Sequence, residues 1–187
     1  MFECFYPYEY ADSVFQIDYK SLYDLGFRGI IFDVDNTLVH HGEEATCEVE
    51  SLFRQIQQIG FQTILLSDND AERLERFVTN IDTQYICDAG KPNPAGYIKA
   101  VRMLKTKKSE TVVIGDQIFK DIWGANKSGL ASILVKFIKG ENETKIGKRR
   151  YLEYLILNAW KYNKTYYKRL GNIFTEEENT DEEKVIL

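Results

Sequence analysis

The sequence lacks paired cysteines, an excess of positive charge and any long apolar run, and each absence excludes a class of protein. Its three cysteines are an odd number without paired spacing, so we expect neither a disulfide framework nor a zinc site, and a reducing, cytoplasmic setting. The net charge of -5 excludes bulk nucleic-acid binding by the whole chain, although a local basic patch remains compatible with it. We expect no signal peptide, and no run of about eighteen apolar residues is present to span a membrane.

The composition is that of a globular protein with a sizeable core: 187 residues, 44% hydrophobic and 28% charged. Five short apolar runs are predicted strands: 29–34, 61–66, 85–87, 111–115 and 131–135. The segments between them have helical spacing: 48–59, 70–79, 94–105 and 117–128. Gly60 and Pro94 stand where a helix ends and begins. The alternation predicts an α/β fold with a doubly wound, five-stranded parallel sheet.

Polar residues follow four of the predicted strands at the carboxyl ends, where such sheets place their sites. They are Asp33 and Asp35 after the first, Ser67 after the second, Lys91 after the third, and Asp116 and Asp121 after the fourth. Each alone has a structural explanation, as a turn, a helix cap, a solvated lysine or a first-turn acid. Their convergence on one crevice predicts a functional site.

Asp33 and Asp35 have the spacing of a nucleophile and a general acid–base. Asp33 can attack phosphorus and form an acyl phosphate, and Asp35 can protonate the leaving oxygen and then deprotonate the hydrolytic water. Carboxylate and phosphate repel each other, so the attack needs a cation, and Mg²⁺ suits an oxygen site with few protein ligands. The predicted metal-binding residues are Asp33, Asp35 through its backbone carbonyl, Asp116 and Asp121.

The predicted phosphate-binding residues are Thr37, Ser67, Asn69 and Lys91. Ser67 and Lys91 would hold phosphoryl oxygens and offset developing charge. His40 and His41 follow the first acidic pair in a flap, where they either touch substrate and assist proton transfer or are merely solvated.

These motifs together resemble the haloacid-dehalogenase (HAD) superfamily of phosphatases. Asp33-Val-Asp-Asn-Thr-Leu-Val resembles the first motif, Ser67 the second, Lys91-Pro-Asn-Pro the third and Gly115-Asp116-Gln-Ile-Phe-Lys-Asp121 the fourth. The resemblance covers residues 28 to 135 and implies a HAD-like Rossmannoid fold with the nucleophile, acid–base and Mg²⁺ roles given above.

A narrower resemblance is to the YqeG-type members of subclass IIIA, whose relatives include phosphatases for phosphatidylglycerophosphate. It is carried by Gly115-Asp116-Gln117, by the stretch from Asp121 to Gly129, and by the lead-in from Asp12 to Gly26. Where that group has Ser-Asn-Asn, this chain has Ser67-Asp68-Asn69. A carboxylate aimed into a phosphate pocket weakens anion binding, so we expect Asp68 to point outward.

The spacing leaves no room for a cap domain over the crevice. About a dozen residues separate Asp35 from the helix at 48, and the 23 between Ser67 and Lys91 are already used by a helix and a strand. An open crevice suits a phosphate carried on something large, such as a membrane lipid, a protein or a polymer. With the resemblance, this makes phosphatidylglycerophosphate a candidate substrate.

Residues 136–170 hold ten Lys and Arg residues against three Asp and Glu. On a helical projection the apolar side carries Leu152, Leu155, Ile156, Ala159, Trp160, Tyr167 and Leu170, and the other side carries Arg150, Lys161, Lys164 and Lys168. Such a helix either lies on an anionic membrane at its inner face, through residues 149–170, or packs its apolar stripe on the core.

The chain is therefore expected to have three parts: a phosphatase domain over 1–140, a basic amphipathic helical extension over 141–174 and an acidic, disordered tail over 175–187. A rival interpretation is a non-enzymatic or dual-role protein that binds RNA or a ribosomal surface, which has no need of the catalytic acids. A second rival interpretation is a receiver domain. The phosphoacceptor of that fold lies on the third strand, whereas Asp33 lies on the first long strand.

Overall fold

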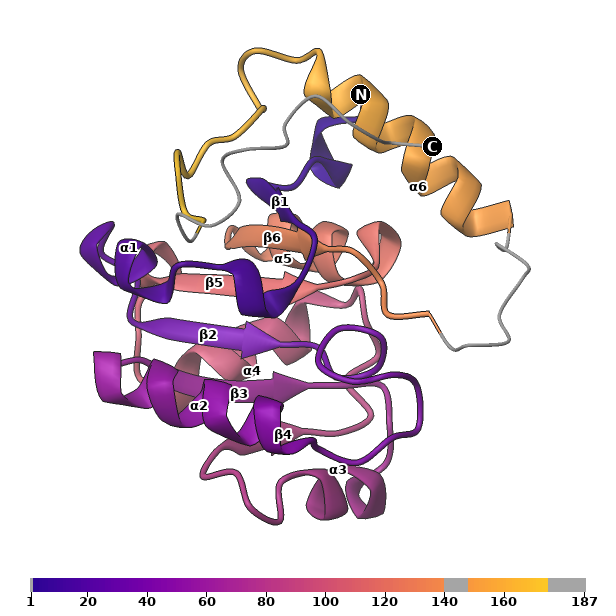
Figure 1. Ribbon diagram of the computed structural model, residues 1–187. Helices are drawn as coiled ribbons and strands as arrows, with labels where there is room; N and C mark the ends of the chain where they lie inside the picture. The colour runs from indigo at the N-terminus through magenta and orange to yellow at the C-terminus, as the bar shows by residue number, and fades with distance from the viewer. Residues whose placement is uncertain (1, 140–147, 175–187) are drawn as a thin grey trace.

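The computed structural model describes residues 2–139 and 148–174, and its centre is a six-stranded parallel sheet (Figure 1). The strands are β1 (Glu9–Ala11), β2 (Gly29–Phe32), β3 (Gln62–Leu66), β4 (Gln84–Ile86), β5 (Thr111–Gly115) and β6 (Ala131–Val135). Their order is β1-β6-β5-β2-β3-β4, and every neighbouring pair is parallel. The prediction of five strands is wrong by one, because the three residues of β1 are too short to form an apolar run.

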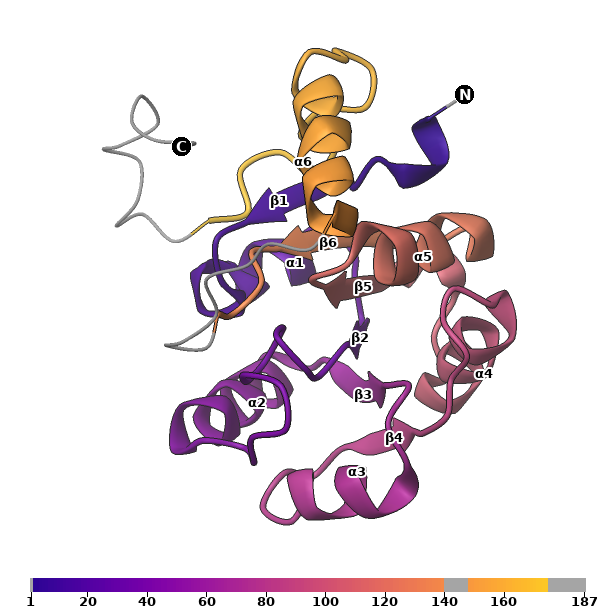
Figure 2. The same ribbon diagram turned by 90° about the vertical axis from the view of Figure 1, so that its right-hand side faces the viewer.

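Helices cover both faces of the sheet (Figure 2). They are α1 (Tyr19–Asp24), α2 (Cys47–Ile59), α3 (Ala71–Phe77), α4 (Pro94–Leu104), α5 (Trp123–Ser128) and α6 (Lys148–Lys161), with short 3-10 turns at Glu3–Phe5, Val14–Gln16 and Lys108–Glu110. The buried side chains of α1, α2 and α3 form one core cluster and those of α4 and α5 another, on opposite sides of the sheet. The doubly wound prediction is confirmed, and the described residues contain no cap domain.

Alternate residues of the central strands enter the two core clusters. In β2, Ile30 and Phe32 pack on the α2 side and Ile31 packs on the α4 side, and all three are fully buried. Successive side chains of a strand point to opposite faces, so a strand covered on both faces reads as a continuous apolar run. Gly60 ends α2 in the left-handed conformation with φ 115°, as the sequence predicts.

The predicted helix over 117–128 begins instead with a π-helical turn, Ile118–Ile122, that leads into α5. The amides of Asp121 and Ile122 both donate to the carbonyl of Gln117, at 2.8 and 3.3 Å. A π turn widens the helix locally and recurs at functional sites. Here it carries Asp121 beneath the carboxyl end of β5.

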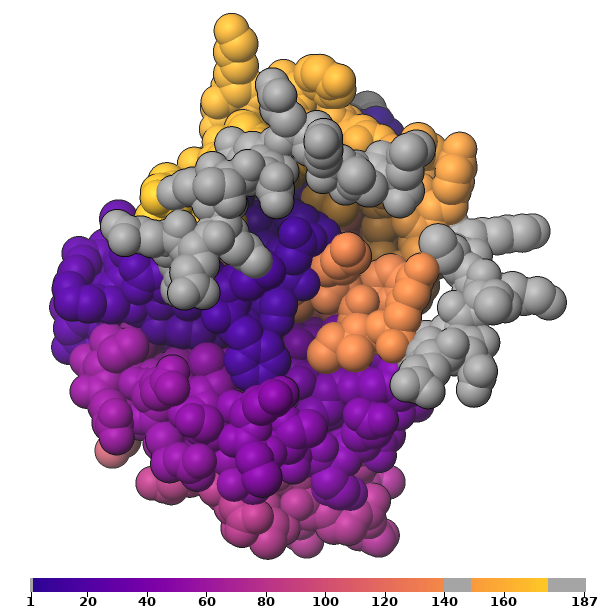
Figure 3. Space-filling view, viewed as in Figure 1, coloured from indigo at the N-terminus to yellow at the C-terminus, as the bar shows by residue number. Residues whose placement is uncertain are grey.

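Helix α6 packs on the core through only part of the predicted apolar side. Ile156 and Trp160 are buried in a cluster with Tyr6, Ile118 and Leu134, among others. Leu152 and Leu155, which belong to the predicted apolar side, are 48% and 46% exposed. Figure 3 shows α6 and the residues after it, in orange to yellow, at the end of the molecule opposite the magenta and pink residues around β4.

Within residues 2–139 and 148–174, no helix is long and apolar enough to cross a membrane. The predicted acidic tail over 175–187 and the start of the predicted extension, through residue 147, lie outside the described residues. The division of the chain into three parts stays a prediction.

Candidate active site

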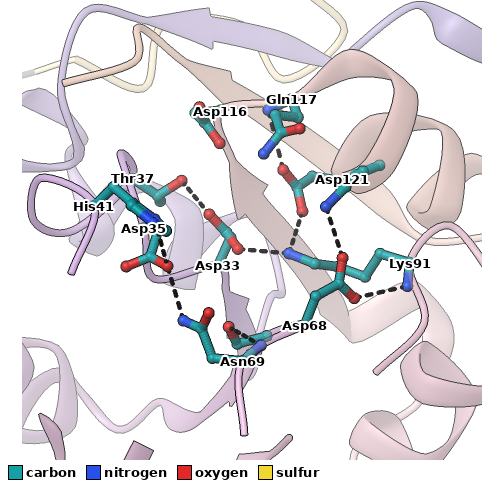
Figure 4. A network of polar contacts seen from close by, with 12 residues as sticks. Asp33, Asp35, Thr37, His41, Asp68, Asn69, Lys91, Asp116, Gln117 and Asp121 are labelled. Atoms are coloured by element: carbon teal, nitrogen blue, oxygen red, sulfur yellow. Dashed lines mark hydrogen bonds and ion pairs between the residues drawn. The ribbon is translucent and has the colours of Figure 1, made fainter. Parts of the chain in front are cut away.

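The carboxyl ends of neighbouring strands bring the predicted site residues together. Asp33 follows β2, Ser67 follows β3 and Asp116 follows β5, and β2 lies between β3 and β5 in the sheet. The amide of Asp33 donates to Ile114 of β5 at 2.9 Å and so continues the sheet by one residue. Figure 4 shows the side chains of Asp33, Asp35, Lys91, Asp116 and Asp121 gathered at this edge.

Lys91 joins the first and last acidic motifs. Its Nζ donates to Oδ1 of Asp33 at 2.5 Å and to Oδ1 of Asp121 at 2.8 Å, and its side chain is 3% exposed (Figure 4). Burial alone would lower the pKa of Lys91, but the charges of Asp121 and Asp33 raise it well above its ordinary value. Lys91 is therefore a fixed cation beside the predicted nucleophile.

Three buried carboxylates form a cluster that a metal ion can occupy. Ligand atoms of Asp33, Asp116 and Asp121 all lie within 4.8 Å of one another. Burial and the nearby charge of Asp121 raise the pKa of Asp33 to about 6, although Lys91 acts to lower it. Burial and the charges of Asp33 and Asp121 raise the pKa of Asp116 to about 7. Among the described residues, Oδ1 of Asp116 finds no hydrogen-bond partner although it is buried. A carboxylate set with an unsatisfied oxygen fits Mg²⁺, which prefers oxygen ligands.

The backbone around Asp121 packs closely against its carboxylate and holds it by a hydrogen bond. Oδ2 of Asp121 accepts from the amide of Gln117 at 3.0 Å, and the side chain is 1% exposed. A Cβ on Gly115 would lie 2.4 Å from Cγ of Asp121. Only glycine allows β5 to come this close to the π turn.

Asp35 lies beside the buried cluster and is held by a separate set of partners. Its carboxylate accepts from Nδ2 of Asn69 at 2.8 Å and from the amide of Gly42 at 3.2 Å, and Nδ1 of His41 lies 3.1 Å away. Burial raises the pKa of Asp35, but these hydrogen bonds and the charges of His41 and Arg73 outweigh it and lower the pKa below its ordinary value. Asp35 is therefore a carboxylate at rest, and His41 is placed to exchange a proton with it.

Besides Lys91, two further predicted phosphate-binding residues bond to the acidic pair. Oγ1 of Thr37 donates to Oδ2 of Asp33 at 2.8 Å, whereas Asn69 donates to Asp35. Thr37 is buried and comes from the turn after β2. Both side chains thus orient a carboxylate, and their contact with a phosphate stays a prediction.

Ser67 and Asp68 lie in the loop after β3. Ser67 is buried, and its Oγ accepts from the amide of Asn69 at 3.2 Å. The Asp68 carboxylate accepts from the amide of Lys91 at 2.9 Å and from Nζ of Lys120 at 2.8 Å, with 32% of the side chain exposed. Asp68 therefore lies at the rim of the site, where the charge of Lys120 offsets its own.

Helix α6 contributes a cation to the site, Arg150, although the helical projection places it on the side opposite the apolar residues. The guanidinium of Arg150 donates to Oδ2 of Asp116 and, at 2.6 Å, to the carbonyl of the same residue. It also donates to Glu153 at 2.9 Å, and Glu153 accepts from the amide of Ile118 at 3.0 Å. The prediction for Arg150 is wrong because the rotation of α6 turns this side chain inward. In the sequence, the local sign of this contact is Glu153, an acid three residues after Arg150.

Comparison with known proteins agrees with this geometry. The family model of haloacid dehalogenase-like hydrolases matches residues 44–129. The chain is 32% identical over 174 residues to the "Probable phosphatase YqeG" of Bacillus subtilis (strain 168), covering 92% of this chain and 97% of the relative. It is 26% identical over 166 residues to phosphatidylglycerophosphate phosphatase 1, chloroplastic/mitochondrial, of Arabidopsis thaliana, covering 82% of this chain and 47% of the relative. The NagD structure from E. coli K-12 shares the fold with a TM-score of 0.50 and 12% identity, over 65% of this chain and 93% of NagD.

Proposed function

The chain belongs to the haloacid dehalogenase-like hydrolases and is a phosphatase of the YqeG type, and from this premise we propose that it hydrolyses phosphate monoesters through an aspartyl-phosphate at Asp33. The observation that carries the proposal is the contact of Lys91 with both Asp33 and Asp121, inside a buried cluster that includes Asp116. The four residues come from three separate segments of the chain and serve no evident purpose in stabilising the core. Burying charges costs free energy, and buried groups with perturbed pKa values cluster at functional sites.

In the first step an Asp33 oxygen attacks phosphorus, and the bond from phosphorus to the leaving oxygen breaks as Asp35 gives its proton to that oxygen. In the second step the Asp35 carboxylate takes a proton from water, and the water oxygen displaces Asp33 from phosphorus. Inorganic phosphate is released and both carboxyl groups are restored. Because the pKa of Asp35 is lowered, it must first receive a proton, and His41 at 3.1 Å can deliver it.

Asp33, Asp116 and Asp121 would hold Mg²⁺, with the Asp35 carbonyl as a further ligand. When bound, the ion would neutralise the repulsion between the phosphate and these carboxylates. Lys91 holds its positive charge beside Asp33 throughout, so it can bind a phosphoryl oxygen as negative charge develops there. Ser67, Asn69 and Thr37 are the proposed neutral donors around the same phosphate.

The substrate we propose is bulky, such as phosphatidylglycerophosphate. The absence of a cap domain in the described residues leaves the crevice open to a large leaving group, and a relative with that activity matches 82% of the chain. Helix α6 supports a peripheral contact with an anionic membrane through residues 149–170, on the inner face. Tyr151, Leu152, Tyr154 and Leu155 of α6 are 65%, 48%, 43% and 46% exposed, and Arg149 beside them is exposed as well.

The test is a phosphate-release screen with and without Mg²⁺ that includes phosphatidylglycerophosphate, small sugar phosphates and phosphorylated peptides. We expect Mg²⁺-dependent release, fastest on the lipid, and loss of release in Asp33→Asn. Asp24→Asn, an exposed acid on α1, is the matched control and should retain full activity. Equal release by wild type and Asp33→Asn would defeat the mechanism, and fastest turnover on small sugar phosphates would defeat the substrate.

A further inference from the structure

One oxygen of the acidic cluster differs from the others in its hydrogen bonding. Oδ1 of Asp116 is buried and accepts no hydrogen bond from the described residues. Both oxygens of Asp33 and both oxygens of Asp121 already accept one from a protein donor. A buried polar atom without a partner costs free energy unless a ligand satisfies it. Oδ1 of Asp116 is therefore the oxygen of the cluster that most needs a ligand.

The second oxygen of the same carboxylate is held by Arg150 of α6. Nη2 of Arg150 donates to Oδ2 of Asp116, and Nη1 donates to the carbonyl of Asp116 at 2.6 Å. One planar guanidinium thus contacts both the side chain and the backbone of one residue, and such paired contacts fix the orientation of a carboxylate. With Oδ2 engaged in this way, Oδ1 is the oxygen left to a cation.

The guanidinium of Arg150 is itself held by neighbours other than Asp116. Nη1 also donates to Glu153 at 2.9 Å, and the guanidinium carbon lies 4.7 Å from the centre of the Phe137 ring. Glu153 is buried, and its other oxygen accepts from the amide of Ile118 at 3.0 Å. The packing of α6 on the π turn therefore sets the position of Arg150, and Arg150 in turn sets the orientation of Asp116.

The number of oxygens that a carboxylate offers distinguishes two common cations. Ca²⁺ takes about 6–8 oxygen ligands and accepts carboxylates through both oxygens, whereas Mg²⁺ requires a near-octahedral shell at about 2.0–2.1 Å and usually keeps several waters. A carboxylate that offers a single oxygen suits the smaller Mg²⁺ ion. Asp116 is such a carboxylate as long as Arg150 occupies Oδ2.

We propose that Arg150 is a positioning residue that restricts Asp116 to binding a cation through Oδ1 alone, and that it thereby sets the preference of the site for Mg²⁺ over Ca²⁺. The inference rests on the proposed function, since it concerns the cation of the same site. It goes beyond that function by assigning the choice of cation to one side chain of α6. Without Arg150 the Asp116 carboxylate is able to turn and offer both oxygens, which favours Ca²⁺.

The test measures the Kd of Mg²⁺ and of Ca²⁺ by isothermal titration calorimetry on the full chain, without substrate. Arg150→Met removes the donors and the charge but retains a long side chain. Both cations carry the same charge, so the loss of the positive charge of Arg150 changes both affinities alike and cancels from their ratio. Residues that orient a metal ligand change metal affinity about 10–100-fold when they are lost. We expect the ratio of the Ca²⁺ Kd to the Mg²⁺ Kd to fall about tenfold in Arg150→Met.

Three further variants separate orientation from charge and from packing. Arg150→Lys retains the charge beside Asp116, but an ammonium group lacks the planar fork of a guanidinium, so its ratio should lie between those of wild type and Arg150→Met. Arg149→Gln is the matched control for charge, because it removes an exposed arginine from the preceding position of α6. Ile156→Val is the control for packing, because it removes one methyl group from the buried side of α6. Both controls should keep the wild-type ratio.

The outcomes distinguish this inference from the proposed function. A wild-type ratio in both Arg150→Met and Arg150→Lys would overturn the inference and leave the phosphatase function standing. An equal fall of the ratio in Ile156→Val would overturn it too, because the effect would then come from looser packing of α6. A wild type that binds Ca²⁺ as tightly as Mg²⁺ would also contradict it. The expected ratios, together with no phosphate release from any ester of the screen above, would support the role of Arg150 and overturn the function.

Discussion

The close approach of Gly115 to Asp121 makes this glycine a sensitive position next to the acidic cluster. A Cβ there would lie 2.4 Å from Cγ and 2.6 Å from Cβ of Asp121. Non-bonded carbon atoms prefer separations of about 3.5–4.0 Å, so Gly115→Ala requires a displacement of about 1 Å. Lys91 and the amide of Gln117 hold the two Asp121 oxygens, so the displacement must disturb the buried cluster.

A shift of about 1 Å in a catalytic group can lower turnover about 100-fold, and overpacking of a filled site costs about 1–3 kcal/mol. We therefore expect Gly115→Ala to fold, to unfold at a lower temperature and to lose about 100-fold in kcat. Phosphate release under saturating substrate measures kcat. Thermal unfolding measures the loss of stability, and its dependence on Mg²⁺ concentration measures how far the cluster still binds the ion.

Gly29→Ala is the matched control, because its Cβ would meet Thr106 at 2.9 Å at the amino end of β2, away from the carboxylates. It should lower stability and leave kcat within about threefold of wild type. Turnover by Gly115→Ala in that same range would refute the reasoning. A double variant, Gly115→Ala with Asp121→Gly, gives a second check, because Asp121→Gly removes the side chain that the new Cβ would contact. A kcat of the double variant clearly below that of Asp121→Gly alone would also refute the reasoning.

Three further predictions concern α6 and the acidic cluster. Arg150→Ala leaves the buried Asp116 carboxylate without its guanidinium partner, so denaturant titration should show a loss of about 3 kcal/mol in the free energy of unfolding, and Arg150→Lys a smaller loss. Trp160→Ala removes a side chain that is 1% exposed and should cost about 3–5 kcal/mol, with faster hydrogen exchange concentrated in α6. The pKa of Asp116 is raised from 3.8 to about 7, so the folded state binds more protons than the unfolded state between these values. Without Mg²⁺ the free energy of unfolding should therefore fall as pH rises from about 5 to about 8. Asp116→Asn should flatten this slope, and a slope unchanged in that variant would contradict the assignment.

The constellation of candidate site residues could be predicted because these residues stand at the carboxyl ends of neighbouring parallel strands. Once β2, β3 and β5 are recognised as buried apolar runs, the fold brings Asp33, Ser67 and Asp116 to one edge without further information. The position of Lys91 depends also on its side-chain length, because the side chain extends from the loop after β4 to Asp33.

Arg150 could not be predicted in the same way, because the apolar side of α6 is wider than the part that packs on the core. Ile156 and Trp160 are buried, whereas Leu152 and Leu155 on the same side are exposed. Periodicity alone cannot choose which part of this side packs on the core, and the choice decides whether Arg150 turns to water or to Asp116. Contact with the π turn and the N-terminal segment makes that choice, and such contacts depend on tertiary structure.

The π turn at Ile118–Ile122 and strand β1 were missed for different reasons. A helical spacing of apolar residues is nearly the same with one residue inserted, so the π turn leaves no distinct pattern. Strand β1 is a three-residue edge strand whose pairing with β6 comes from the sheet and not from its own composition.

The central claim is that the phosphoryl group passes through Asp33, and it can be tested by trapping the intermediate. Wild type, Asp35→Asn and Asp33→Asn are mixed with the cleaved ester and Mg²⁺, quenched in acid within one turnover, digested and analysed by mass spectrometry. We predict a phosphoryl group on the peptide that contains Asp33 in wild type. In Asp35→Asn it should accumulate, because the general base for its hydrolysis is missing. Phosphate released at the wild-type rate with no modification of that peptide, or with modification retained in Asp33→Asn, would contradict the account.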